Sequence, residues 1–386
     1  MMDPMSHRTR HGAGERALGL GLVVWAMACG PELVGDGPPE DGSGSETGPM
    51  PTTGGTSVGT TATTTGANPT TSSPDSTAGS SSGDPEIDCG PLEPGLTYVW
   101  CGDVRTRSPV AADDLFLYFA RADDGLWRVP MEGGDAEMLV DGIGDIRTLR
   151  HVHGRLYWNA FSEGELREFE LPDGPMVVYG GLVSPSSFAV GEAIVVATQY
   201  GVNLPVVNVL DGSLTPLFSG PGTPFEFDYA GHAFFFHEGL LYFATNTDSG
   251  NNATPLYRGL TLGPEYSADP VLDVTGIQDS VLDGSALWWA RYSPEGSGIV
   301  DTSLDPLGRS TEMFALERQP IALVLTEERV YWRETSLDEQ AVRSGLRRGG
   351  DLQDHIVGSI GLGGLASTSS GVVFATYDAL VRIDGS

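Results

Sequence analysis

A pair of large, adjacent side chains recurs along most of this chain at intervals of about forty residues. The seven pairs are Tyr118-Phe119, Tyr157-Trp158, Val195-Val196, Tyr242-Phe243, Trp288-Trp289, Tyr331-Trp332 and Val373-Phe374. Their successive spacings are 39, 38, 47, 46, 43 and 42 residues. The units are rich in Val, Phe, Tyr and Trp, and turn residues interrupt them roughly every 8–12 positions. Such a period predicts four short strands per unit and a β-propeller.

One unit predicts all four strands of a blade, here meaning one four-stranded sheet. They are 146–154 (inner), 155–161, 164–171 and 175–182 (outer). Before the outer strand, Asp173-Gly174 predicts a tight hairpin with backbone in the left-handed region. Other units have the pairs Gly133-Gly134, Asp211-Gly212 and Gly349-Gly350 at this place.

The ends of the repeat predict how the ring closes. Twisted sheets need cover on both faces, so blades stack around an axis and bury the repeated aromatic residues between them. These residues are therefore expected in the core and not in a substrate platform. The last unit supplies three strands, and the unassigned segment 96–100 precedes the first. We therefore predict an all-β, seven-bladed propeller closed by 96–100 as the outer strand of blade seven.

The LYW element resembles the YWTD repeat in propellers of cell-surface receptors, and also the NHL-type repeats of secreted bacterial propellers. The resemblance covers about 290 residues of this chain. Thr-Asp does not follow the aromatic pairs here, and the YWTD family forms six blades. The resemblance therefore implies the architecture and no functional residues.

The N-terminus predicts export. Residues 7–16 carry three arginines, and the apolar run Ala17–Ala28 is shorter than the roughly 20 residues of a membrane-spanning helix. The following AMAC resembles the lipobox of bacterial lipoproteins, which implies signal peptide 1–28 and lipidation of Cys29. An ordinary cleavage site after Ala28, with a chance cysteine, remains the alternative. We expect the protein in the cell envelope, anchored by lipid and facing the periplasm or exterior, or else secreted.

Residues 29–88 are predicted to be a disordered linker. Of residues 41–85, 35 are Ser, Thr, Gly or Pro, which bury too little apolar surface to offset the entropy of ordering. The propeller domain is then 89–386. Its cysteines, Cys89 and Cys101, are expected to form a disulfide outside the cytoplasm, with two buried thiols as the alternative.

Charge limits the partners. The net charge is −31, and all 21 basic residues are arginines. Such a field disfavours nucleic acid and anionic lipid surfaces, so contact with a membrane is expected through the lipid anchor only. A monomer that binds an unknown protein, glycan or small ligand is the leading expectation. High solubility alone also explains the charge.

Longer segments in blades three to six predict the binding face. They are 219–236, 246–255, 292–301 and 334–345. Loops after the second and fourth strands emerge on one face, and loops on a rigid scaffold often bind ligands. The predicted contacts are Asp228, Tyr229, Asn251, Asn252, Tyr292 and Glu334. Tolerated surface insertions are the alternative.

The sequence contains no motif that identifies a reaction, and it predicts no cofactor and no catalytic residue. His151 and His153 lie in an H-x-H pattern on a predicted inner strand, which would direct both to one face. No third ligand accompanies them, so no metal site is assigned. The leading function is a surface-tethered, non-enzymatic binding module. A lipid-anchored hydrolase or lyase that uses the propeller channel is the alternative.

Overall fold

The computed structural model describes residues 89–385 with internal gaps. The gaps are 106–107, 122–123, 183–184, 186, 192–193, 198–204, 209–213, 217–233, 245–253, 260–267, 275, 294–295, 306–307, 309, 337–338 and 359–360. Contacts divide the chain into Met1–Gly79 and Ser80–Ser386, and all described residues belong to the second unit. Within these residues every regular element is a strand.

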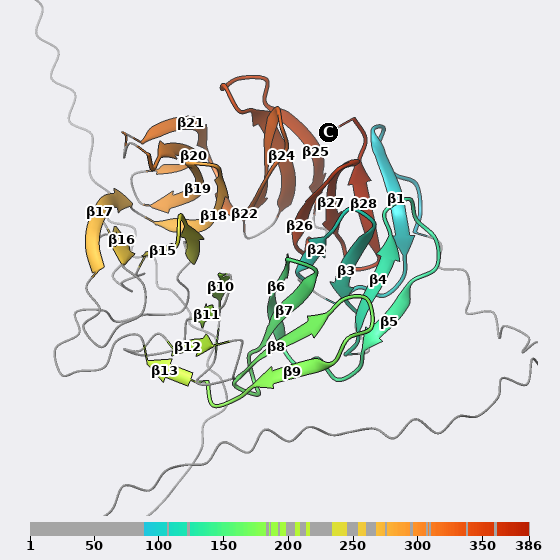
Figure 1. Cartoon of the computed structure of the whole chain (residues 1–386). Helices are drawn as coiled ribbons and strands as arrows, with labels where there is room; N and C mark the ends of the chain where they lie inside the picture. Colours follow the sequence, from blue (N-terminus) through green and yellow to red (C-terminus); the bar gives the residue numbers. More distant parts are fainter. Residues whose placement is uncertain are drawn as a thin grey trace, which may run out of the picture. The chain divides into compact units, whose positions relative to one another are not determined.

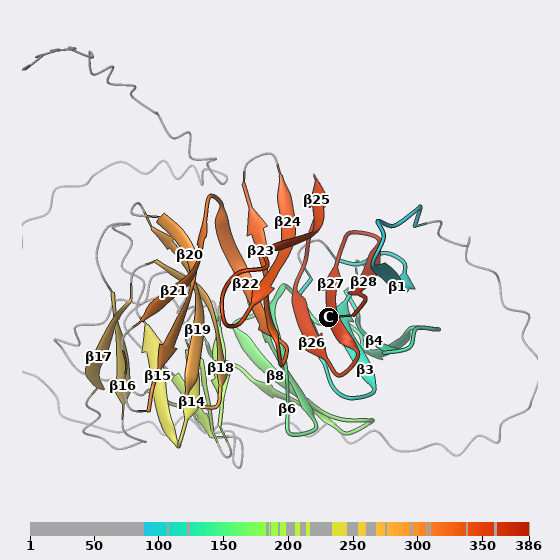
Figure 2. The same cartoon turned by 90° about the horizontal axis from the view of Figure 1, so that it is seen from above.

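The strands form seven four-stranded antiparallel sheets (Figures 1 and 2). The first contains β2 (Val110–Ala112), β3 (Phe116–Ala120), β4 (Leu126–Pro130) and β5 (Glu137–Val140). The second contains β6 (Ile146–Val152), β7 (Arg155–Ala160), β8 (Glu165–Glu170) and β9 (Met176–Tyr179). The third contains β10 (Phe188–Val190), β11 (Ile194–Ala197), β12 (Pro205–Asn208) and β13 (Leu214–Pro216).

Four more sheets follow in chain order. The fourth contains β14 (Phe234–His237), β15 (Leu240–Ala244), β16 (Thr254–Gly259) and β17 (Ala268–Val274). The fifth contains β18 (Ile277–Asp283), β19 (Ala286–Ser293), β20 (Gly296–Ser303) and β21 (Thr311–Leu316). The sixth contains β22 (Gln319–Leu325), β23 (Arg329–Thr335), β24 (Gln340–Leu346) and β25 (Gln353–Gly358). The last contains β26 (Leu365–Thr368), β27 (Gly371–Ala375), β28 (Ala379–Ile383) and β1 (Leu96–Cys101).

The adjacent pair of large side chains explains how the sheets pack. Successive side chains of a strand point to opposite faces, so the pair serves two interfaces. In β7, Trp158 packs against the first sheet with Tyr118, whereas Tyr157 packs against the third sheet with Phe188. Full burial of such a side chain contributes roughly 1.5–3 kcal/mol. The prediction that the repeated aromatics form the core is confirmed where the structure describes them.

Each sheet packs against the next through such clusters. Apolar clusters join the first sheet to the second, the second to the third, the fourth to the fifth, the fifth to the sixth, the sixth to the last, and the last to the first. The first strands of the third and fourth sheets, β10 and β14, are neighbours. Second strands such as β27 are buried throughout, while the outer strand β9 is mostly exposed. The predicted all-β propeller is confirmed.

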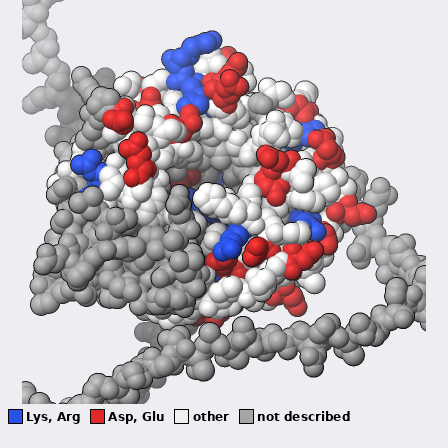
Figure 3. All heavy atoms as spheres, in the orientation of Figure 1, with Lys and Arg blue, Asp and Glu red and all other residues white. Residues whose placement is uncertain are grey.

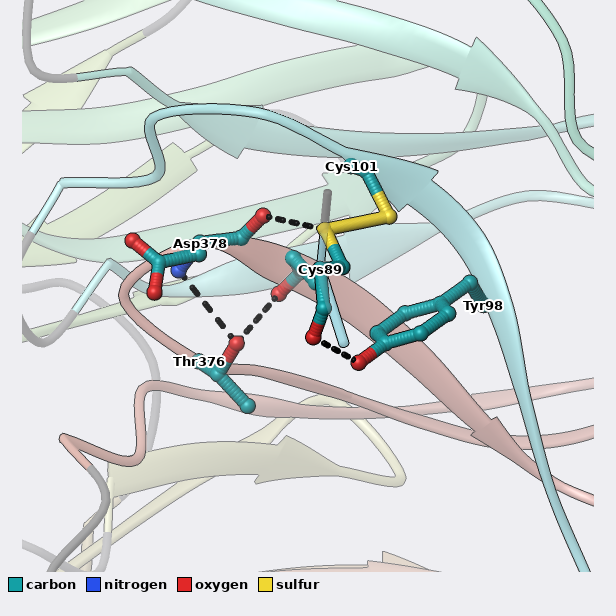
Figure 4. The surroundings of a disulfide bond; sticks show 6 residues. Cys89, Tyr98, Cys101, Thr376 and Asp378 are labelled. Carbon is teal, nitrogen blue, oxygen red and sulfur yellow. Dashed lines mark hydrogen bonds between the residues drawn. A yellow bond between two sulfur atoms is a disulfide. The ribbon is translucent and has the colours of Figure 1, made fainter. Parts of the chain in front are cut away.

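The last sheet is completed from the N-terminal side, as predicted. Strand β1 pairs with β28, from Leu96 opposite Ile383 to Cys101 opposite Ala379, and the two lie side by side in Figure 1. The Cys89–Cys101 disulfide closes a twelve-residue separation beside this seam. The Tyr98 hydroxyl donates to the Cys89 carbonyl at 2.5 Å, and Cys89 Sγ lies 3.3 Å from the Asp378 carbonyl oxygen (Figure 4). The predicted disulfide is confirmed.

One turn prediction is wrong. Gly133-Gly134 and Gly349-Gly350 have positive φ values, but neither Asp173 nor Gly174 has one. Instead, the Leu171-Pro172 bond is cis and the Gly174 amide donates to the Glu170 carbonyl at 2.7 Å. The turn is therefore closed by this hydrogen bond and not by left-handed residues at 173 and 174. Asp211-Gly212 lies outside the described residues.

Two predicted insertions are hairpin extensions. Segment 292–301 belongs to β19 and β20, which pair from Ala286 opposite Ser303 to Ser293 opposite Gly296. Segment 334–345 belongs mainly to β23 and β24, which pair from Arg329 opposite Leu346 to Thr335 opposite Gln340. The extra residues lengthen strands because they pair with one another. Most of 219–236 and 246–255 lies outside the described residues.

No helix in the described part of the chain is long and apolar enough to cross a membrane.

Candidate functional site

A cavity of about 860 Å³ lies between the fifth, sixth and last sheets. It lies where first strands turn into second strands, at the β18–β19, β22–β23 and β26–β27 turns, with the β24–β25 turn beside them. This face is opposite the face chosen from the sequence. Its lining residues are Val281, Leu282, Asp283, Leu325, Thr326, Glu327, Glu328, Arg329, Arg347, Ser367, Thr368, Ser369 and Gly385.

Both arginines of the cavity are held by carboxylates. Arg347 pairs with Asp283 across the fifth and sixth sheets, and its guanidinium carbon lies 5.5 Å from the centre of the Trp288 ring. Arg329 pairs with Asp351 at 2.6 Å and also donates to the Ser344 hydroxyl at 3.0 Å. These pairs fix the walls and satisfy much of the positive charge. The lining therefore presents a net negative, hydroxyl-rich surface.

A hydrogen-bonded chain leads from the cavity into the sixth sheet. Ser344 Oγ lies 2.8 Å from His355 Nε2, and the His355 ring stacks on Tyr331 at 5.5 Å between ring centres. Burial, followed by the Arg329 charge, lowers the pKa of His355. This histidine is therefore neutral near pH 7 and acts as a structural link.

The hydroxyls and carboxylates of the turns form the rest of the site. Thr326 accepts the Arg329 amide at 3.2 Å, and the Thr368 hydroxyl donates to the Gly371 carbonyl at 2.6 Å. Ser367, Ser369 and both glutamates are exposed. Such a surface suits hydrogen bonding to hydroxyl or ammonium groups.

The residues predicted to bind a partner are not assembled into one site. Asp228, Tyr229, Asn251 and Asn252 lie outside the described residues. Tyr292 is 48% exposed near the end of β19. Glu334 is a correction: its side chain is completely buried in β23, accepts the Trp332 indole N–H at 2.8 Å and pairs with Arg343 at 3.1 Å. It is not available to an external partner.

The two histidines of the H-x-H pattern do not share a strand face. His151 belongs to β6 and stacks against Tyr118 at 6.1 Å between ring centres. His153 lies beyond the strand in the turn, with φ 51°. Among the described residues, no group of three or more His, Cys, Asp or Glu side chains is arranged to hold a metal. Cys29 lies outside the described residues.

The cavity was missed in the sequence because its residues are ordinary turn residues of three repeats. Asp283, Glu327 and Ser369 lie at corresponding turns, yet their proximity depends on which sheets are neighbours. The signal in the sequence that could have indicated this cavity is the recurrence of hydroxyl and acidic residues at the turns that follow the first strands of successive sheets.

The comparisons identify a fold and no family. No family profile and no curated protein matches the sequence. A catalytically inactive virginiamycin B lyase from Staphylococcus aureus, solved with quinupristin, superposes with TM-score 0.53 at 14% identity, covering 74% of this chain and 98% of its own. A chain of a mitotic checkpoint complex superposes with TM-score 0.51 at 10% identity, covering 77% and 96%. A chain of a nidogen–laminin complex has a TM-score of 0.45 at 17% identity, covering 60% and 89%. At these identities the similarity establishes the β-propeller fold alone.

Proposed function

We propose that the protein is a non-enzymatic binding module that takes a small, polar, neutral or cationic ligand in the cavity between the fifth, sixth and last sheets. The observation that carries this proposal is the composition of the cavity wall. Asp283, Glu327 and Glu328 line the cavity together with Arg329 and Arg347, and each arginine pairs with a carboxylate, Asp351 and Asp283 respectively. The carboxylates and hydroxyls of the wall can accept hydrogen bonds from a neutral polyhydroxylated molecule or from an amine. Because both arginines are already paired, no free positive charge repels an amine there.

The net charge of the chain agrees with this ligand class. A charge of −31 repels anions at long range and favours the approach of cations. Affinity for a cationic ligand is therefore expected to fall with added salt.

The test is calorimetric titration with neutral sugars (glucose, N-acetylglucosamine) and with the polyamine spermidine. Ser367→Trp should fill the cavity from an exposed position near the end of β26 and abolish binding of the probe that binds the wild type. Ser162→Trp is the matched control, because Ser162 is an exposed turn serine on the opposite face. Binding that survives Ser367→Trp, or no binding of any probe at millimolar concentration, would contradict the proposal.

The face predicted from the sequence is the competing location. It would use Asp228, Tyr229, Asn251, Asn252 and Tyr292 as contacts, without the buried Glu334. Replacing 246–252 by a four-residue turn should then abolish binding that Ser367→Trp leaves intact. The two variants together distinguish the faces.

The alternative function, a hydrolase or lyase in the propeller channel, is supported by the structural neighbour that is a lyase. In that case Ser367→Trp would leave turnover unchanged. Conversion of the bound probe, followed by mass spectrometry, separates the two functions.

The proposed setting is the cell envelope, with Cys29 lipidated, the linker as a tether and the propeller as a monomer. We also infer that the seven sheets are seven blades of one closed ring. Support for this comes from the clusters that join neighbouring sheets and from the β10–β14 contact.

A further inference from the structure

Charged side chains on the first strands of non-neighbouring sheets lie close enough for their charges to interact. Arg150 lies on the first strand of the second sheet, and Asp279 on the first strand of the fifth. Two sheets separate these strands along the chain, yet their charges interact, as do those of Asp279 and Arg333. First strands from non-neighbouring sheets approach only across the central channel. In Figure 3 the face is hollowed near this centre.

Asp279 is held rigidly by backbone groups. One carboxylate oxygen accepts the Ser280 amide at 2.8 Å, and the other accepts the Leu323 amide of β22 at 2.8 Å. The carboxylate therefore joins the fifth and sixth sheets. The two amide bonds fix the position of the Asp279 carboxylate, which acts on Arg150 through its charge, with no hydrogen bond between the two side chains among the described contacts.

Arg150 has no hydrogen bond or ion pair with any residue that the structure describes. Its guanidinium carbon lies 5.9 Å from the centre of the Phe188 ring on β10, and its side chain is half-buried. A guanidinium carries five N–H donors in a planar fork. Because the residue is only half-buried, water or a ligand can supply the acceptors for this fork.

The second arginine of the group is already engaged. Arg333 donates to the carbonyls of Leu362 and Gly363 in the connection before β26. The three side chains carry two positive charges and one negative, an excess of one positive charge in a chain of net charge −31. This local charge is opposite in sign to the whole molecule.

We propose that the central channel binds the carboxylate group of a small ligand, through the guanidinium fork of Arg150. A carboxylate matches the fork with two parallel hydrogen bonds and neutralises the single excess charge. The fully buried Phe188 ring packs beside the guanidinium and helps to position it. This site is separate from the cavity between the fifth, sixth and last sheets, and it goes beyond the function proposed there.

The test uses acetate as the probe, titrated into the full chain and followed by ligand-observed NMR. Arg150→Gln should weaken acetate binding by roughly 10- to 100-fold, the range for a charged hydrogen bond. Arg147→Gln is the matched control on the same strand, because its side chain is 47% exposed and pairs with Asp145. It should leave acetate binding unchanged.

Asp279 supplies a result of opposite sign. Asp279→Asn removes the competing negative charge, so acetate should bind this variant more tightly than the wild type. Burial raises the pKa of Asp279 to about 6. The two amide hydrogen bonds and the charges of Arg150 and Arg333 lower it, but by less than burial raises it. Wild-type affinity should therefore increase as the pH falls from 7.5 to 5.5, and the affinity of Asp279→Asn should not.

Thermal melting establishes that each variant is folded. Should Arg150→Gln not fold, Arg150→Lys keeps the charge without the fork and should still bind acetate less tightly than the wild type. Equal acetate binding by the wild type and the Arg150 variant, or an equal loss in Arg147→Gln, overturns the proposal. So does no detectable acetate binding to the wild type at tens of millimolar.

Discussion

Single polar residues adapt the repeat where sheets meet their connections. The position after the pair of large side chains is alanine in five units, at Ala120, Ala197, Ala244, Ala290 and Ala375. In β7 it is Asn159, which accepts the Thr148 amide at 2.7 Å and donates to the Pro185 carbonyl at 2.5 Å. In β23 it is Arg333, which donates to two carbonyls of the next connection. These side chains satisfy buried backbone groups that alanine would leave unpaired.

The buried Glu334 predicts a loss of stability. Glu334→Ala should lower the free energy of unfolding by about 2–4 kcal/mol, because it leaves the Trp332 indole N–H unpaired and removes one partner of the largely buried Arg343. Tyr292→Ala, at an exposed position, should change it by less than about 0.5 kcal/mol. Urea unfolding measures both. Similar values for the two variants would contradict this placement of Glu334.

Asp279 predicts a pH dependence of stability. Its carboxyl loses a proton near the ordinary pKa of 3.8 when unfolded and at about 6 when folded. The folded state therefore binds the extra proton between these values, so this residue favours folding at low pH and the benefit disappears as pH rises through 6. The difference in melting temperature between wild type and Asp279→Asn should change between pH 4 and 6.5. A constant difference in melting temperature over that pH range would contradict the raised pKa of Asp279 in the folded state.

At the scale of elements, β1 completes the last sheet from the N-terminal side. Strand β1 is the only N-terminal strand in a sheet otherwise built from the C-terminal end of the described chain. Its backbone pairing is supplemented by the Gly102 amide, which donates to the Asp378 carbonyl at 2.8 Å, and by the disulfide. Because β1 pairs with β28, the outer edge of β28 is not left as an unpaired strand edge.

Deleting 89–101 should therefore unfold the whole domain, because β28 would lose its partner. Cys89→Ser together with Cys101→Ser is a milder change, expected to cost roughly 3 kcal/mol on the chain-entropy account of a short loop. Differential scanning calorimetry measures both. A normal melting transition after the deletion would show that the ring closes without β1.

At the scale of the whole molecule, the propeller and the N-terminal segment are expected to act independently. Contacts separate Met1–Gly79 from Ser80–Ser386. If the segment is a tether with a lipid at Cys29, metabolic labelling with a fatty acid should mark the wild type and not Cys29→Ala. Deleting 35–80 should leave the melting temperature nearly unchanged. Absence of label in the wild type would indicate a freely secreted domain.

The sequence by itself determined most of the strands and the propeller architecture. The forty-residue period, the paired large side chains and the glycine turns predicted the strands, because each unit repeats the same local chemistry. The unassigned segment 96–100 likewise predicted the seam, since three strands at the C-terminal end require a fourth.

Only the tertiary structure decided where function could lie. Residues 292–301 and 334–345 were predicted as inserted loops, yet most of them pair as longer hairpins, and the Glu334 side chain is buried. Arg150 and Asp279 are 129 positions apart, and the cavity draws on the turns of three sheets. Residues that lie close together because their sheets pack side by side, or because their strands line the same channel, have no characteristic separation in the sequence. Their proximity therefore depends on how the sheets are arranged in space.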